Sequence, residues 1–284
     1  MQTRQILTGH TRIVGVIGDP VEHSRSPQMH NAAFAKADLD YVYVPFHVRP
    51  SDLANAIAGF KAINVVGINV TLPHKQAVIP HLTSISREAE LIGAVNTLTF
   101  VEGNIYGDNT DAPGVLKALE EDGNMPVPVG ENIVVLGAGG AARAVVVALA
   151  LRGVASITIA NRTVETAISL AEEMDRKTGV SMQGMGLTDE RLPLSVSESK
   201  LLVNTATTSM DVTQPLLISV DWLQPNTIVY DIVYTPPVTP LMQAATERGC
   251  QTLGGIGMLV HQGAIAFEKW TGVTPCTETM RQAL

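Results

Sequence analysis

The most constraining feature of the sequence is the stretch Ile133-Val-Val-Leu-Gly-Ala-Gly-Gly-Ala-Ala-Arg143, where an apolar run stops at three glycines. This order predicts a buried strand, a tight turn and a helix. Gly137 allows the turn, and Gly139 lets the backbone approach a pyrophosphate. Gly140 or Ala142 keeps the helix close to its strand. Because the first N–H groups of a helix attract anions, we expect a nucleotide-phosphate site here, with an ordinary turn of an α/β domain as the alternative.

The segments after this stretch continue the alternation of strand and helix. Apolar β-branched runs predict strands at residues 133–136, 156–160, 201–204 and 227–231, and helices at about 140–152, 164–176 and 240–249. Such alternation predicts a parallel sheet with helices on both faces. We therefore expect an α/β chain whose residues 112–254 form a Rossmann-type, doubly wound cofactor domain.

The end of the second strand of this domain indicates which nucleotide is bound. An NAD-preferring fold has Asp or Glu at this point, to hold the ribose 2′-hydroxyl. Here the sequence is Asn161-Arg162-Thr163, and an arginine flanked by amide and hydroxyl donors suits a 2′-phosphate. The pattern favours NADP over NAD. The alternative is a solvated Arg162 next to a helix cap at Thr163.

The first part of the chain also alternates. Strands are expected at 12–18, 41–48 and 65–71, helices at 28–37 and, capped by Ser51, at 51–60, and a hairpin of 93–100 with 104–107. After residue 254, a glycine-rich start leads into a long amphipathic helix that would close the chain over its own beginning. The predicted second α/β domain, which would bind substrate, therefore comprises residues 1–111 and 255–284.

Polar residues of this first domain lie at strand ends. Asn69, Thr71, His74 and Lys75 share one rim at the carboxyl edge of the predicted sheet, where open α/β sheets place ligands. Asp111 precedes a helical run, where the helix N-terminus favours its charged form. It is expected either to cap that helix or, if the fold brings it to Lys75, to exchange a proton with it.

Two hydroxyls lie in the loop after the first strand. Ser24 and Ser26 are one residue apart and could together bind a carboxylate or a polar substrate edge. Ser26 is followed by Pro27, so the alternative for Ser26 is an ordinary helix N-cap with proline at the first helical position.

Composition excludes several other classes of protein. The formal charge of −8 argues against nucleic acid as a partner. Cys250 and Cys276 alone give neither a disulfide framework nor a metal pair, and the histidines lack zinc spacing, so no metal is expected. The N-terminus has no secretory h-region, and the apolar segment 133–151 contains Arg143 and three glycines, which argues against a membrane span. We expect a cytoplasmic protein, and a homodimer is compatible with the sequence.

Several motifs together resemble the shikimate dehydrogenase family, in order and spacing, over nearly the whole chain. They are Ser24-Arg-Ser-Pro27, Gly67-Ile-Asn-Val-Thr-Leu-Pro-His-Lys75, Gly93-Ala-Val-Asn-Thr97, Gly107-Asp-Asn-Thr-Asp111, Gly137-Ala-Gly-Gly-Ala-Ala-Arg143, Asn161-Arg-Thr163 and Gly254-Gly-Ile-Gly-Met-Leu-Val-His-Gln262. The resemblance implies the reversible reduction of 3-dehydroshikimate by NADPH, with Lys75 and Asp111 as the acid–base pair.

The resemblance also implies the residues that bind each molecule. Ser24 and Ser26 would hold the substrate carboxylate, and the ring hydroxyls would contact Asn69, Thr71, Asn96, Asp111 and Gln262, with Tyr234 nearby. The cofactor would contact Gly137, Ala138, Gly139, Gly140, Ala141, Asn161, Arg162 and Thr163, with Ile232, Gly255 and Met258 near the nicotinamide.

The residues are compatible with other interpretations, and two residues depart from the family pattern. His74 is the rival base, since its ordinary pKa lies nearer neutrality. A quinate/shikimate dehydrogenase using either nicotinamide is one alternative, although Ser26 in place of threonine resembles the shikimate-preferring form. A catalytically silent NADP-binding regulatory protein is another, and the presence of both Lys75 and Asp111 argues against it. Ser209 replaces a usual glycine, and Thr166 replaces a second arginine, which weakens the expected preference for NADP.

Overall fold

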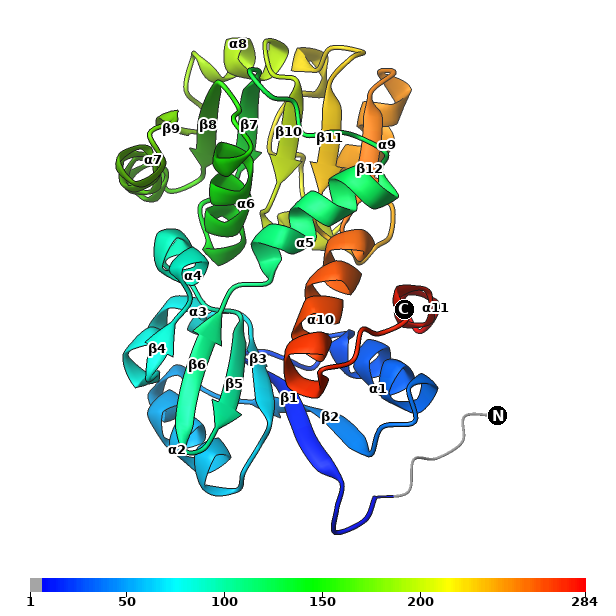
Figure 1. The fold of residues 1–284 in the computed structure, drawn as a ribbon. Helices are drawn as coiled ribbons and strands as arrows, with labels where there is room; N and C mark the ends of the chain where they lie inside the picture. Colours follow the sequence, from blue (N-terminus) through cyan, green and yellow to red (C-terminus); the bar gives the residue numbers. More distant parts are fainter. Residues whose placement is uncertain (1–6) are drawn as a thin grey trace. The chain divides into compact units, whose positions relative to one another are not determined.

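The structure of the chain is a computed structural model that describes residues 7–284, except for the side chain of Ser209 (Figure 1). The sequence predicts no secretory signal at the N-terminus. The first six residues of that segment lie outside the described part of the chain. The chain forms two compact units. Unit 1 comprises residues up to Thr110 together with Val260–Leu284, and unit 2 comprises Asp111–Leu259.

Unit 1 is built around a six-stranded sheet with the order β2-β1-β3-β5-β6-β4. Its strands are β1 (Arg12–Gly18), β2 (Tyr41–His47), β3 (Gly67–Val70), β4 (Ser84–Ile85), β5 (Thr97–Val101) and β6 (Asn104–Asp108). Its helices are α1 (Ser26–Lys36), α2 (Leu53–Ala62), α3 (His74–Ala77), α4 (Arg87–Ile92) and α11 (Thr277–Gln282), with short 3-10 turns η1 (Pro50–Asp52) and η2 (Ile79–His81). Strands β1, β2 and β3 are parallel, whereas β5 runs antiparallel to β3 and to β6.

Unit 2 is built around a second six-stranded sheet, in which every pair of neighbours is parallel. The order is β12-β11-β10-β7-β8-β9. The strands are β7 (Asn132–Leu136), β8 (Ser156–Asn161), β9 (Ser181–Gly186), β10 (Leu201–Asn204), β11 (Ile228–Asp231) and β12 (Gln251–Gly254). The helices are α5 (Asp111–Lys117), which continues as the π-helical turn η3 (Ala118–Asp122), α6 (Gly140–Leu151), α7 (Val164–Thr178), α8 (Leu192–Ser197) and α9 (Pro240–Glu247), with 3-10 turns η4 (Thr207–Met210) and η5 (Val220–Trp222). This doubly wound sheet confirms the α/β prediction.

Helix α10 (Ile256–Thr271) begins in unit 2 and ends in unit 1. Its first residues follow β12 directly, and its last turns carry Phe267 and Trp270, which are buried.

The local causes of these elements are visible in the sequence. Strand β7 is an apolar run whose last four residues are buried, as expected for a central parallel strand. Helix α6 is apolar apart from Arg143 and is buried from Ala142 to Ala150, so it packs against its surroundings on all sides. Helix α7 ends at Gly179, which adopts the left-handed conformation at φ 73° that terminates many helices.

The structure contradicts the cap predicted at Ser51 and the alternative role of Ser26 as a cap. Ser26 is the first residue of α1 and not its cap, because the N-cap position is taken by Arg25, whose side chain makes no capping bond. Ser51 lies within the 3-10 turn before α2, whose N-cap is Asp52. The predicted strand 93–100 also begins too early, since Gly93 ends helix α4 with φ 69° and β5 starts only at Thr97.

An aromatic cluster in unit 1 surrounds His30, which is fully buried on α1. Its ring stacks on Tyr43 at 4.3 Å between centroids and 6° between planes, and it also lies close to Phe34, Phe267 and Trp270. Within the described residues, neither ring nitrogen of His30 has a hydrogen-bond partner. Burial therefore lowers the pKa of His30 to about 3, so the ring is neutral in the folded protein.

Acid should destabilise unit 1 through His30. The unfolded chain binds a proton near the ordinary pKa of 6.5, whereas the folded chain does so only near 3. The stabilising contribution of the neutral ring is therefore complete above about pH 6.5 and is lost as the pH falls towards 3. Between pH 7 and pH 5 this one group should lower the free energy of unfolding by about 2 kcal/mol.

Urea titrations at these two pH values test the expectation. The loss between pH 7 and pH 5 should be about 2 kcal/mol smaller in a His30→Leu variant, which keeps a similar apolar volume but cannot be protonated. An equal loss in the variant and the parent protein would show that His30 does not govern acid sensitivity.

Within residues 7–284, the structure contains no helix with the length and apolar character needed to cross a membrane.

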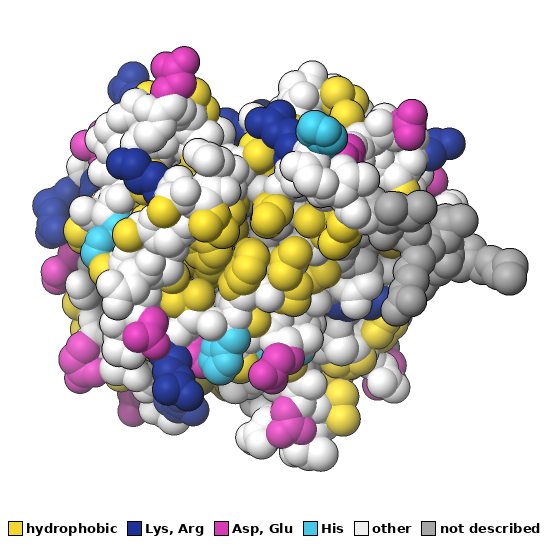
Figure 2. All heavy atoms as spheres, turned by 90° about the horizontal axis from the view of Figure 1, so that it is seen from below, with side chains coloured by type: hydrophobic (Ala, Val, Ile, Leu, Met, Phe, Trp, Pro, Cys, Tyr) yellow, Lys and Arg dark blue, Asp and Glu magenta, His cyan; other side chains and the backbone are white. Residues whose placement is uncertain are grey.

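Figure 2 shows hydrophobic side chains gathered across the middle of one face, with charged side chains around them.

Candidate functional site

The glycine loop of unit 2 has the geometry of a phosphate cradle. Gly137 has φ 101°, and a Cβ there would lie 2.5 Å from the Thr205 hydroxyl oxygen, so this position requires glycine. At Gly139 a Cβ would meet nothing within 4 Å, which leaves open space in front of the helix. Gly139 is also the N-cap of α6, and neither a side-chain cap nor an acidic residue occupies the first turn. The loop therefore fits an anionic group at the positive end of α6.

The position of this loop in the sheet is also that of a nucleotide site. Strand β7 is flanked by β8 on one side and by β10 on the other, so the strand order reverses between β7 and β10. Ligands of open α/β sheets bind at the carboxyl ends of strands at such a point. A pocket at this end is lined by residues that include Leu136, Asn204, Thr208, Leu217 and Leu241.

The carboxyl end of β8 carries the candidate residues for the nucleotide ribose. Arg162 and Thr163 are exposed, and the amide of Asn161 donates to the Thr163 carbonyl at 3.0 Å. Thr163 occupies the N-cap of α7 but makes no side-chain capping bond, which removes the alternative of a capping hydroxyl. Thr166 is exposed in the first turn of the same helix.

A buried carboxylate organises the loops after β10 and β11. Asp231 is 0% exposed, and its oxygens accept hydrogen bonds from the Asn204 amide at 2.9 Å and from the Thr239 hydroxyl at 2.7 Å. It also accepts the backbone N–H of Val233 at 3.1 Å. These bonds fix the segment that holds Ile232 and the half-buried Tyr234. The sequence pattern did not reveal Asp231, whose partner Asn204 is distant in the chain.

Gly255 lies directly against this segment. A Cβ at Gly255 would be 2.0 Å from the Ile232 carbonyl oxygen, and the Gly255 N–H donates to the Val233 carbonyl at 3.2 Å. The close approach explains why glycine stands at this position. It also brings together two of the three residues expected near the nicotinamide, and the third, Met258, is buried in the first turn of α10.

Replacement of Gly255 by alanine should therefore destabilise the protein by about 1–3 kcal/mol, because the added methyl group must displace backbone atoms. Gly59→Ala is a suitable control, since a Cβ at this position in α2 meets nothing within 4 Å and alanine favours a helix. Chemical denaturation should show a loss for the first variant and no loss for the second. Equal stability of both variants would contradict the close approach described at Gly255.

In unit 1 the predicted serine pair begins helix α1. Ser26 is buried, whereas Ser24 is half-buried, and the Ser26 N–H points to the Ser24 hydroxyl oxygen at 3.4 Å. Ser24 therefore has a local role that the sequence did not suggest. The hydroxyl of Ser26 is a hydrogen-bond partner of the buried Tyr43.

A network of neutral polar side chains lies at the ends of β3, β5 and β6. The Asn96 amide donates to the Thr110 hydroxyl at 3.0 Å, and its oxygen accepts the Thr110 N–H at 2.8 Å. The Thr110 hydroxyl lies 3.5 Å from the Gln262 side-chain oxygen on α10. Asn69 joins the network through the Thr97 hydroxyl at 3.1 Å. The structure thus brings together three predicted substrate residues, Asn69, Asn96 and Gln262, and adds Thr97 and Thr110, for which the sequence pattern indicates no ligand role.

The two candidate bases beside β3 have different environments. His74 is 0% exposed, and its Nε2 lies 2.7 Å from the Val48 carbonyl, which can only accept a hydrogen bond. This leaves the His74 ring inside the protein, where it cannot reach a ligand directly. Lys75 is half-buried, and so is Thr71, at the end of β3. The geometry supports Lys75 over His74.

Asp111 is a buried residue and the first residue of α5. It belongs to unit 2, whereas Lys75 belongs to unit 1. The residue before it, Thr110, is fixed in unit 1 by the bonds to Asn96.

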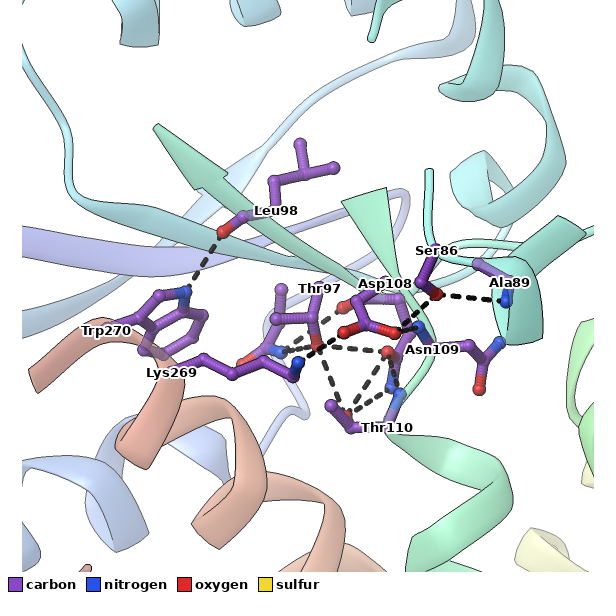
Figure 3. Close-up of polar contacts among 11 residues, drawn as sticks. Ser86, Ala89, Thr97, Leu98, Asp108, Asn109, Thr110, Lys269 and Trp270 are labelled. Carbon is purple, nitrogen blue, oxygen red and sulfur yellow. Dashed lines mark hydrogen bonds and ion pairs between the residues drawn. The ribbon is translucent and has the colours of Figure 1, made fainter. Parts of the chain in front are cut away.

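The last turns of α10 are fixed to the sheet of unit 1 by two contacts, which Figure 3 shows. Lys269 forms an ion pair with Asp108, and the Trp270 indole N–H donates to the Leu98 carbonyl at 3.0 Å. Burial opposes the charged form of Asp108, but hydrogen bonds from Lys269 and Ser86 outweigh it and hold the Asp108 pKa below its usual value. These contacts fix the helix that carries Gln262.

The fold and these two groups of residues define an α/β oxidoreductase with a dinucleotide-binding unit. Comparison with known proteins identifies the family within this class of oxidoreductases. Residues 16–98 match the shikimate dehydrogenase substrate binding domain, residues 124–215 match the shikimate/quinate 5-dehydrogenase family, and residues 255–284 match the shikimate 5′-dehydrogenase C-terminal domain. The chain belongs to the shikimate dehydrogenase family of NADP-dependent oxidoreductases.

Similar proteins cover almost the whole chain. The shikimate dehydrogenase (NADP(+)) of Methanopyrus kandleri is 47% identical over 96% of this chain and 95% of its own length. A shikimate dehydrogenase crystallised in complex with NADP+ is 40% identical over 98% of this chain and 96% of that one, with a TM-score of 0.90. Shikimate 5-dehydrogenase from Listeria monocytogenes, in complex with shikimate and NAD, is 39% identical over 99% of both chains, with a TM-score of 0.90.

Proposed function

We propose that the protein catalyses the reversible reduction of 3-dehydroshikimate to shikimate with NADPH. The observation that carries the proposal is the pairing of a phosphate cradle at Gly137–Gly140 in unit 2 with a neutral polar network in unit 1. Unit 1 binds the substrate, and unit 2 binds NADP. The expected boundaries of these functional regions are residues 1–111 with 255–284, and residues 112–254.

The polar network suits a polyhydroxylated ring. Asn96 and Gln262 offer amide groups, and Asn69 offers its side-chain oxygen as an acceptor, because both of its amide hydrogens are bonded within the protein. None of the three carries a charge that a neutral ring would leave unpaired. Ser24 and Ser26 at the start of α1 hold the substrate carboxylate, and Thr71 and Tyr234 complete the contacts. Burial of Asn69, Asn96 and Gln262 keeps water from competing for their hydrogen bonds.

NADPH, when bound, supplies the hydride to the substrate carbonyl carbon. The carbonyl oxygen then gains negative charge, and the Lys75 ammonium stabilises it and donates a proton to it. Asp111 would act with Lys75 as the acid–base pair, and its carboxylate would accept a hydrogen bond from the adjacent ring hydroxyl. In the reverse direction neutral Lys75 accepts the hydroxyl proton.

Residues of unit 2 would hold the cofactor. Backbone N–H groups at Gly139, Gly140 and Ala141 would bind the pyrophosphate at the start of α6, with Ala138 in the turn. Asn161, Arg162 and Thr163 would hold the ribose 2′-phosphate. Ile232, Gly255 and Met258 would contact the nicotinamide.

A second candidate function, the use of either nicotinamide with shikimate or quinate, is favoured by one observation. Thr166 offers no positive charge in the first turn of α7, so Arg162 is the one cation of the candidate 2′-phosphate residues.

Purified protein should reduce NADP+ in the presence of shikimate. If it binds NADP+ but turns over neither acid, the protein is a cofactor-binding protein without this activity.

A further inference from the structure

Tyr43, on strand β2, lies beneath the candidate substrate residues of unit 1. Its side chain is 2% exposed, and its hydroxyl donates to the Asn69 side-chain oxygen at 2.7 Å. The same hydroxyl is a hydrogen-bond partner of Ser26. One phenol group therefore contacts two residues that the proposed function assigns to opposite ends of the substrate, namely its carboxylate and its ring hydroxyls.

The hydrogen bonds of Asn69 define the orientation of its amide. The amide nitrogen donates to the Asn96 carbonyl at 3.2 Å and to the Thr97 hydroxyl at 3.1 Å. The Thr97 hydroxyl donates in turn to the Asn96 side-chain oxygen at 2.9 Å, so its own oxygen is available to accept. Both amide hydrogens of Asn69 are thus used, and its oxygen accepts from Tyr43. Toward a ligand Asn69 retains one acceptor lone pair, so it can receive a hydrogen bond from a substrate hydroxyl.

Helix α1 holds Tyr43 in this position through two consecutive residues. The Asn31 side chain bonds the backbone of Tyr43 on both sides, accepting its N–H at 2.8 Å and donating to its carbonyl at 3.0 Å. The ring of His30 stacks on the Tyr43 ring. Since α1 begins at Ser26, the helix that presents the serine also sets the depth of the phenol that reaches Asn69.

We propose that Tyr43 is a positioning residue that fixes Asn69 as a hydrogen-bond acceptor for a substrate ring hydroxyl. Tyr43 itself does not touch the substrate. The proposal rests on the proposed function, because it assumes that Asn69 binds the substrate.

Tyr43→Phe is the direct test, because it removes the hydroxyl and keeps the ring that stacks on His30. The KM for shikimate should rise about 3- to 10-fold, the effect of one neutral hydrogen bond, while kcat and the KM for NADP+ stay unchanged. Tyr41→Phe is the matched control. Tyr41 is a buried tyrosine of the same strand whose hydroxyl contacts Arg12 and the Trp270 carbonyl instead. This control should leave the KM for shikimate unchanged.

A double-mutant cycle with Asn69→Ala distinguishes positioning from a general structural effect. If Tyr43 acts through Asn69, the double variant should have the same KM for shikimate as Asn69→Ala alone. Multiplicative effects of the two substitutions, or an equal rise in KM for Tyr41→Phe, would overturn the proposal while leaving the proposed function intact. Absence of shikimate turnover in the parent protein would overturn the proposed function and this proposal with it.

A second variant guards against a folding defect in Tyr43→Phe. Asn31→Ala loosens the backbone of Tyr43 but leaves the hydroxyl in place, and it should raise the KM for shikimate in the same direction with an unchanged KM for NADP+. Unchanged KM for shikimate in Asn31→Ala and in every folded Tyr43 variant would contradict the positioning role.

Discussion

Replacement of Lys75 by alanine should reduce kcat for shikimate oxidation by about 10²- to 10⁴-fold, the usual contribution of a general acid–base group. The ammonium would both stabilise the charge on the carbonyl oxygen and supply the proton, so no neighbouring group replaces it directly. Cofactor affinity should hardly change, because the phosphate cradle belongs to unit 2 and Lys75 to unit 1. Steady-state kinetics combined with a fluorescence titration of NADPH measure both quantities.

The activity of Lys75→Ala also tests whether His74 is the acid–base group. Lys61→Ala is the control for loss of a lysine, since Lys61 is exposed at the end of α2 and lies outside the candidate site. It should retain full activity. If Lys75→Ala keeps most of its activity, His74 becomes the leading base despite its burial and its bond to the Val48 carbonyl.

Replacement of Arg162 by alanine should lower kcat/KM for NADP+ by about 10- to 100-fold, the value of one or two charge-assisted hydrogen bonds. The reaction with NAD+ should stay nearly unchanged, because NAD+ lacks the 2′-phosphate that Arg162 would contact. Kinetics with both nucleotides measure the ratio. Arg176→Ala, at the exposed far end of α7, is the control and should change neither value.

The reciprocal variant tests the same electrostatic argument from the other side. Thr166→Arg adds a cation to the first turn of α7, the helix that begins two residues after Arg162, and should increase the preference for NADP+ over NAD+. Equal rates with both nucleotides in the parent protein, and the same rates in Arg162→Ala, would show that Arg162 does not bind the 2′-phosphate.

The sequence predicts the central elements well where hydrophobic runs end at glycine. The β7 strand, the turn at Gly137 and helix α6 were located within one residue at each end. Three edge strands, β4, β9 and β12, were not predicted, and β9 shows a physical reason. Strand β9 reads Ser-Met-Gln-Gly-Met-Gly, which lacks β-branched residues, and its Gly184 allows the backbone of α7 to approach closely. This packing, and not local propensity, makes the segment a strand.

The candidate site was less predictable than the fold because its supporting residues interact over long distances in the chain. Tyr43 and Asn69 are 26 residues apart, and Asn204 and Asp231 are 27 apart. No local pattern indicates such pairs. The cap expected at Ser51 and the alternative cap at Ser26 are wrong for a related reason. The helices start where tertiary contacts allow and not at the nearest serine.

One assay with four combinations distinguishes a shikimate dehydrogenase from a nucleotide-binding protein without this activity. The purified protein is given shikimate or quinate, each with NADP+ or NAD+, and the formation of reduced nucleotide is followed. We predict the highest kcat/KM for shikimate with NADP+, and a low value for quinate with either nucleotide. No reduced nucleotide in any of the four reactions, from protein that binds NADPH, would contradict the assignment as a shikimate dehydrogenase.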